Sequence, residues 1–231
     1  MSWDADQNES MFHLLKELGY DYVESVYSKF STEFPVLAIQ SIFYNSGITT
    51  LDNTEVCANH IKKIIADCKK HGIKVITFGS PTMRIGSKDK IHQLLLSVDE
   101  MLDGTDIKFC IEPNARYYGA EYYNTLEEIV QDLKEYNYKN ITSMIDVGNS
   151  ILEDKIPKDE YKKYKDYISH IHFAAKDLKE IKDYNLYISF YNYLVHKNYK
   201  GCITYEFSNA EDIKKCIKVF IGEINNDKYF I

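Results

Sequence analysis

Residues 141–173, ITSMIDVGNSILEDKIPKDEYKKYKDYISHIHF, contain the pattern that decides the fold. The segment opens with an apolar run at 141–146, passes through a charged stretch with helical spacing near 158–166, and ends with a second apolar run at 168–173. A strand, a helix and a strand in this order predict two parallel strands joined by a helix that covers one face of the sheet.

The same unit recurs on both sides of this segment. Further strands are predicted at 21–27, 36–42, 74–79, 107–112 and 201–207. Further helices are predicted at 9–19, 54–71, 88–103, 125–137, 185–198 and 210–223. With residues 1–4 (MSWD) as the end of one more strand, the pattern predicts an α/β fold. We expect a (β/α)8 barrel with a short or incomplete first strand, forming a single domain over residues 1–231.

The main alternative is a doubly wound open sheet. No GxGxxG or Walker A loop follows any predicted strand, so that fold would lack its usual nucleotide site.

Composition narrows the class of partner. The net charge of −7 disfavours nucleic acid, and no Lys/Arg stripe interleaved with aromatic residues offsets it. The five cysteines are odd in number and form no CxxC pair, which predicts free thiols in a reducing cytoplasm. No apolar run reaches the roughly 18 residues of a membrane span, and the chain start lacks the pattern of a signal peptide. We therefore expect a cytoplasmic protein that acts on a small molecule, without nucleic acid or membrane as a partner.

Four polar side chains fall near the ends of the later strands. Glu112 ends the strand at 107–112, Asp146 ends the strand at 141–146, His172 lies on 168–173, and Glu206 lies on 201–207. Side chains alternate along a strand, so each of these positions faces away from the bulky apolar neighbours that would pack against helices. In a parallel barrel the carboxyl ends of the strands meet at one mouth, so the four side chains are expected to converge there.

Three carboxylates that converge repel one another unless a cation neutralises them. Three oxygen ligands and one imidazole suit one divalent metal ion, Mn²⁺, Mg²⁺, Co²⁺ or Zn²⁺, with positions left open for substrate oxygens. His170 lies one layer deeper on the same strand face and is expected to be structural.

The chain resembles the xylose isomerase-like TIM barrel superfamily, the sugar phosphate isomerase/epimerase group. The resemblance is carried by SWD at 2–4, IEPNARYYGAEYYNT at 111–125, SMIDVGN at 143–149, SHIHFAAKD at 169–177 and ITYEFSN at 203–209. It implies that Glu112, Asp146, His172 and Glu206 are the metal ligands. It further implies that Glu112 and Glu206 are the catalytic acid/base pair of a sugar or sugar-phosphate isomerase or epimerase, an enzyme of carbohydrate metabolism. Because barrels of this group often pair, a homodimer is also expected.

The reaction that this resemblance implies is proton transfer next to a carbonyl, through an enediolate. Substrate contacts are assigned to residues near the barrel mouth: Trp3, Gln40, Arg84, Asn114, Tyr118, Asn149 and Lys176. Two positions depart from the family pattern. Asn149 stands where many epimerases have a histidine, and Lys176 and Lys179 are the nearest basic residues where many have an arginine.

Two alternative functions stay open. A DNA-repair endonuclease of the same superfamily, resembling endonuclease IV, would need a cluster of three zinc ions, but five of the seven histidines lie on predicted helices or helix ends. A barrel that binds a sugar without turning it over would keep the fold and lose the chemistry. Lyase or dehydratase chemistry on a keto-inositol also begins with removal of a proton next to a carbonyl.

Overall fold

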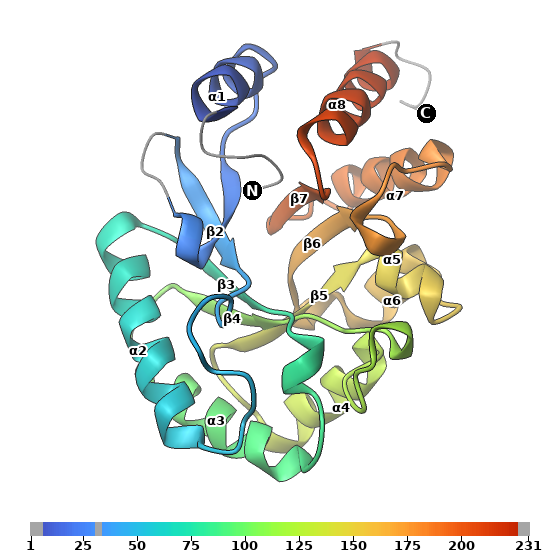
Figure 1. Ribbon diagram of the computed structural model, residues 1–231. Helices are drawn as coiled ribbons and strands as arrows, with labels where there is room; N and C mark the ends of the chain where they lie inside the picture. The colour runs from blue at the N-terminus through green and yellow to red at the C-terminus, as the bar shows by residue number, and fades with distance from the viewer. Residues whose placement is uncertain (1–6, 31–33, 226–231) are drawn as a thin grey trace.

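A computed structural model describes residues 7–30 and 34–225, with residues 221–225 described by their backbone alone. Seven parallel strands follow one another in chain order around a nearly closed barrel (Figure 1). The strands are β1 (Val23–Val26), β2 (Val36–Gln40), β3 (Val75–Phe78), β4 (Lys108–Ile111), β5 (Ile141–Asp146), β6 (Ile168–Ala174) and β7 (Cys202–Glu206). Each overlaps a strand predicted from the sequence, so the predicted barrel is confirmed. The residues proposed for an eighth strand, 1–4, lie outside the described part of the chain.

Helices cover the outside of the barrel. They are α1 (Asn8–Glu17), α2 (Thr54–His71), α3 (Lys88–Met101), α4 (Leu126–Tyr136), α5 (Val147–Leu152), α6 (Pro157–Tyr164), α7 (Tyr184–His196) and α8 (Ala210–Asn225). The bounds of helix α2 follow from its end residues. Asn53 caps its start, and Gly72, with φ of 73°, ends it. Helix α5 was not predicted because it begins directly after β5, without a loop between them to mark its start in the sequence.

Apolar side chains form an inner and an outer layer around the strands. Phe109 and Ile111 of β4 belong to a large buried cluster with residues of α2 and α3, whereas Cys110 between them points into the barrel. The interior cluster combines Ala38, Val75, Cys110, Met144 and Cys202. Cys110 and Met144 lie two residues before Glu112 and Asp146, so this cluster closes the barrel beneath the strand ends. All five cysteines are buried and free, as the sequence predicted.

The seam of the barrel lies between β1 and β7, which share no ladder within the described residues. A side chain bridges it: the hydroxyl of Tyr22 accepts the N–H of Ile203 at 2.9 Å and lies 3.4 Å from the carbonyl oxygen of the same residue. Helices α1 and α8 also contribute to one buried cluster, through Phe12 and Phe220 among others. Among the described helices, none is both long and apolar enough to cross a membrane.

Candidate metal centre

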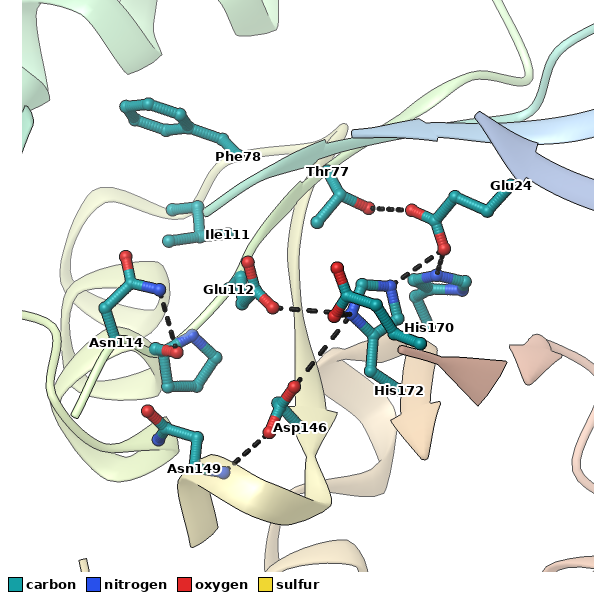
Figure 2. Close-up of polar contacts among 12 residues, drawn as sticks. Glu24, Thr77, Phe78, Ile111, Glu112, Asn114, Asp146, Asn149, His170 and His172 are labelled. Carbon is teal, nitrogen blue, oxygen red and sulfur yellow. Dashed lines mark hydrogen bonds and ion pairs between the residues drawn. The ribbon is translucent and has the colours of Figure 1, made fainter. Parts of the chain in front are cut away.

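Four side chains from four strands converge at the carboxyl ends of the sheet. Glu112, Asp146, His172 and Glu206 each offer one ligand atom, and these atoms lie within 4.8 Å of one another. Figure 2 shows Glu112 and Asp146 directed toward His172. The Nδ1 atom of His172 is 3.3 Å from Glu112 Oε1, 3.2 Å from Glu206 Oε2 and 4.0 Å from Asp146 Oδ2. The structure thus brings together the four residues that the sequence selected.

Asp146 both caps a helix and faces the cluster. One carboxylate oxygen, Oδ1, accepts the N–H of Asn149 at 2.6 Å and so begins helix α5. This bond fixes the side chain and leaves Oδ2 directed toward His172. Separate oxygens of one carboxylate therefore cap helix α5 and face the cluster.

Glu112 reaches the cluster because a glycine lies beside it. A Cβ atom built on Gly79, which follows β3, would stand 1.3 Å from Glu112 Oε2 and 2.5 Å from its Cδ. No other residue type at position 79 leaves the glutamate in this place. Gly79 was predicted only as the last residue of the strand at 74–79, although a glycine at a strand end can mark such a close approach.

His172 is held from behind by a carboxylate that the sequence analysis missed. Glu24 of β1 places its Oε2 atom 2.8 Å from Nε2 of His172 and 2.8 Å from Nε2 of His170. Its other oxygen, Oε1, accepts the hydroxyl of Thr77 at 3.2 Å. Glu24 lies in the apolar run YVESVY, where a lone inward-facing carboxylate on a buried strand was the available signal.

Burial and like charge perturb the acidic groups. Burial in the barrel, reinforced by the neighbouring Glu112 carboxylate, raises the pKa of Asp146 to about 7. Burial likewise raises the pKa of Glu112, against the opposing influence of His172. Burial by itself lowers the pKa of an imidazole, but the charges of Glu24 and Glu206 outweigh it and raise the pKa of His172 well above its usual range. Without a cation, the cluster therefore retains protons that a cation would replace.

The donor set fits a divalent ion. Nδ1 of His172 is fully buried and has no partner in hydrogen-bond geometry, although three carboxylates surround it. An unpartnered buried nitrogen beside carboxylate oxygens is the arrangement that a bound cation satisfies. Mixed oxygen and imidazole donors are compatible with Mn²⁺, Mg²⁺, Co²⁺ and Zn²⁺ alike.

Three residues assigned to substrate lie beside the cluster. The side-chain amide of Asn149 donates to the carbonyl oxygen of Asn124 at 3.0 Å, and its Oδ1 atom is buried without a partner. Asn114 has the same unpartnered Oδ1 atom, while its amide donates to the carbonyl of Pro113. The ring of Tyr118 is 39% exposed, and its hydroxyl accepts the N–H of Asp177 at 3.0 Å.

Of the other four assigned residues, the structure describes three, and none of those three takes part in these hydrogen bonds. Arg84 is fully buried: its Nη2 donates to the carbonyl of Phe78 at 2.7 Å, and its guanidinium carbon lies 4.4 Å from the Phe78 ring centre and 5.3 Å from that of Tyr123. Lys176 is exposed, with Nζ 4.0 Å from the ring centre of Tyr117. Gln40 ends β2, and Trp3 is outside the described residues. The substrate roles of all seven stay predictions.

Comparison with known proteins supports the fold. No family model and no curated protein matches the sequence significantly. Among solved structures, the chain is similar to 3-keto-D-glucoside 4-epimerase from E. coli in its apo form, with a TM-score of 0.72 and 18% identity over 97% of this chain and 95% of that one. It is similar to D-psicose 3-epimerase from Clostridium cellulolyticum, solved with D-tagatose, with a TM-score of 0.71 and 16% identity over 98% and 94% of the two chains.

A third match has a different activity in its name. The family 2 AP endonuclease from Brucella melitensis is similar with a TM-score of 0.74 and 15% identity over 92% of both chains. These matches span nearly the whole chain and confirm the fold of the xylose isomerase-like TIM barrels, as the sequence motifs predicted. At such low identity the similarity shows the fold alone.

Proposed function

We propose that this protein is a divalent-metal-dependent isomerase or epimerase of a sugar or sugar phosphate, which transfers a proton next to a carbonyl. The observation that carries the proposal is the convergence of Nδ1 of His172 with three carboxylates at the carboxyl ends of four strands. Sugar epimerases among the solved structures of the same fold support it.

The proposed ligands are Glu112, Asp146, His172 and Glu206. A bound ion would polarise the substrate carbonyl and lower the cost of removing the adjacent proton. Two of the ligands are also the proposed acid/base pair. Glu112 follows β4 and Glu206 ends β7, so their carboxylates approach Nδ1 of His172 from strands that are not neighbours in the sheet. That placement suits removal of a proton on one face of a carbon and its return on the other.

Three side chains are proposed to contact the substrate. The unpartnered amide oxygens of Asn114 and Asn149 would accept hydrogen bonds from sugar hydroxyls, which removes the cost of leaving them buried and unsatisfied. The partly exposed ring of Tyr118 would form a wall of the site.

The test is exchange of substrate protons with solvent. The full chain, loaded with Mn²⁺, is incubated in D₂O with a panel of ketoses, aldoses and their phosphates, and deuterium incorporation is measured by mass spectrometry after the metal is removed. We expect incorporation at the carbon next to the carbonyl of at least one sugar, together with its epimer or isomer. Glu206→Gln should abolish exchange and leave the thermal unfolding curve of the protein intact.

A matched control is Glu160→Gln on α6. That carboxylate is also partly buried and accepts the Ser150 hydroxyl at 2.6 Å, but it contacts none of the four proposed ligands. It should keep full activity. A wild-type protein that binds Mn²⁺ and exchanges no proton across the panel would instead favour a barrel that binds sugars without turnover.

The endonuclease alternative has its own observation, the similarity to the Brucella enzyme. A cluster of several ions needs more ligands than one ion. Within the described residues, two groups of possible ligands meet, and they share His172. The second consists of Glu24, His170 and His172, in which both imidazoles are hydrogen-bonded to the Glu24 carboxylate. One metal ion per chain supports the isomerase, and three would support the endonuclease.

A further inference from the structure

We propose that Glu24 is a positioning residue that turns the imidazole of His172 so that Nδ1 faces the three carboxylates, and that it thereby sets the affinity of the centre for a divalent cation. The inference rests on the metal centre of the proposed function and adds a residue outside the predicted ligand set.

Both carboxylate oxygens of Glu24 have hydrogen-bond partners. Figure 2 shows its carboxylate behind both imidazoles, on the side away from Glu112 and Asp146. Oε2 lies 2.8 Å from the Nε2 atoms of His170 and His172, and Oε1 is occupied by the Thr77 hydroxyl. An ionised carboxylate only accepts hydrogen bonds, so both Nε2 atoms must carry hydrogen.

The consequence for His172 follows from the two nitrogens of its ring. With hydrogen fixed on Nε2, the lone pair that can bind a cation is the one on Nδ1. Nδ1 is also the atom that faces Glu112 and Glu206. With the ring turned over about its Cβ–Cγ bond, a carbon atom (Cδ2) would face the cluster, and with hydrogen on Nδ1 an N–H would point there. Neither arrangement would offer a nitrogen ligand. Glu24 thus selects the tautomer and the ring orientation together.

Burial makes this control effective. The side chains of both histidines are 0% exposed and that of Glu24 is 1% exposed, so water offers no substitute acceptor. His170 uses the same oxygen of Glu24, and its Nδ1 atom has no partner, which agrees with hydrogen on Nε2. The second histidine adds a hydrogen bond to the carboxylate in a place where an unpartnered charge would be costly.

Glu24 is on the wrong side of the ring to be a ligand of the same ion. Its ligand atom and the Nε2 atoms of the two histidines are close enough for a second cation, but Oε2 of Glu24 already lies at hydrogen-bond distance from both Nε2 atoms. The positioning role therefore predicts one ion per chain. Two ions per chain would mean that Glu24 is a ligand and would overturn the inference.

The experiment is Zn²⁺ binding by the full chain, measured by titration calorimetry. Glu24→Gln retains the size of the side chain but replaces one acceptor oxygen by an NH₂ group, which faces the hydrogen-bond donors of Thr77 and the two histidines. We therefore expect the affinity for Zn²⁺ to be about tenfold weaker than that of wild type. Glu24→Ala removes the acceptor entirely, and we expect a loss of about 100-fold. The control is Asp132→Asn on α4, a buried carboxylate that pairs with Lys88 at 2.6 Å, away from the centre. It should bind Zn²⁺ as wild type does.

A spectroscopic signature separates positioning from general stability. In ¹⁵N–¹H spectra of the Zn²⁺-loaded wild type, His172 should show hydrogen on Nε2 and zinc on Nδ1. In Glu24→Gln, the hydrogen-bonded Nε2–H resonance of His172 should shift and exchange faster with water. Zinc on Nε2 of His172 in the wild type, or unchanged Zn²⁺ affinity in both folded Glu24 variants, would refute the proposal.

These outcomes are separable from the fate of the proposed function. If the wild type binds one Zn²⁺ with the expected signature but never exchanges substrate protons, the isomerase proposal is refuted and the positioning role of Glu24 is retained. A wild type that binds no Zn²⁺ overturns the inference together with metal dependence.

Discussion

Replacement of Gly79 by alanine should disable the centre without unfolding the barrel. The new Cβ would stand 1.3 Å from Glu112 Oε2, whereas ordinary contact begins at 3.4 Å. The carboxylate must therefore move by about 2 Å, the difference between these distances. The clash falls on the far end of a flexible side chain, and Gly79 does not have a positive φ that alanine would strain. Rotation of Glu112 can relieve it at modest cost in folding free energy.

The effect on function should be much larger than the effect on stability. Ligand atoms tolerate displacements of about 0.2 Å from ideal metal distances, and a misplacement of 1 Å can cost about 100-fold in rate. A shift of about 2 Å should thus remove Glu112 as a ligand. We expect Zn²⁺ affinity and proton exchange to fall at least about 100-fold, as in Glu112→Ala, while the melting temperature changes by a few degrees.

A double-mutant cycle tests whether the effect passes through Glu112. Zn²⁺ affinity is measured by calorimetry for Gly79→Ala, Glu112→Ala and the double variant, with circular dichroism as the check on folding. If Gly79→Ala acts only by displacing the carboxylate, it should have no further effect once Glu112 is gone. Wild-type affinity in Gly79→Ala, or full additivity in the double variant, would refute the reasoning.

Three further predictions follow from the same geometry. The pKa of Asp146 is raised to about 7 in the metal-free fold, so below pH 7 a proton competes with the metal ion for this carboxylate. The affinity for Zn²⁺ should therefore fall by at least about tenfold for each pH unit below 7, which calorimetry in a pH series would show. Asp146→Asn keeps an oxygen that can cap α5 but loses the charge; thermal unfolding should change by less than about 1 kcal/mol while metal binding is lost. Tyr22→Phe leaves the N–H of Ile203 without its acceptor, and urea unfolding should show a loss of about 1–3 kcal/mol at unchanged Zn²⁺ affinity.

Local patterns were sufficient to predict the strands and the cluster. A strand in a barrel alternates between interior and helix-facing positions, so a polar residue at the interior position of a strand end stands out against neighbours such as Phe109 and Ile111. Parallel connections then bring the strand ends to one mouth. Both rules act over a few residues, and for this reason Glu112, Asp146 and Glu206 could be placed without a structure.

The contacts that sequence reasoning could not supply join distant parts of the chain. Glu24 and His170 are 146 residues apart, and only the curvature of the sheet brings β1 to β6. Arg84 was predicted to contact substrate because it follows the strand at 74–79 in a loop. In the structure its guanidinium packs against the rings of Phe78 and Tyr123, and Tyr123 has φ of 58°. These are tertiary contacts that the sequence of the loop cannot predict.

The candidate centre and the closure of the barrel depend on the same strand. Strand β1 has a ladder to β2 but none to β7 among the described residues, so its other side is held by side chains. Tyr22 bonds to the backbone of β7 at the lower level, and Glu24 bonds to two histidines of β6 at the level of the centre. A buried polar contact of this kind stabilises only when every member has a partner. Two imidazole nitrogens of this network have no partner, Nδ1 of His170 and Nδ1 of His172, and a cation bound at the centre would supply the one that His172 lacks.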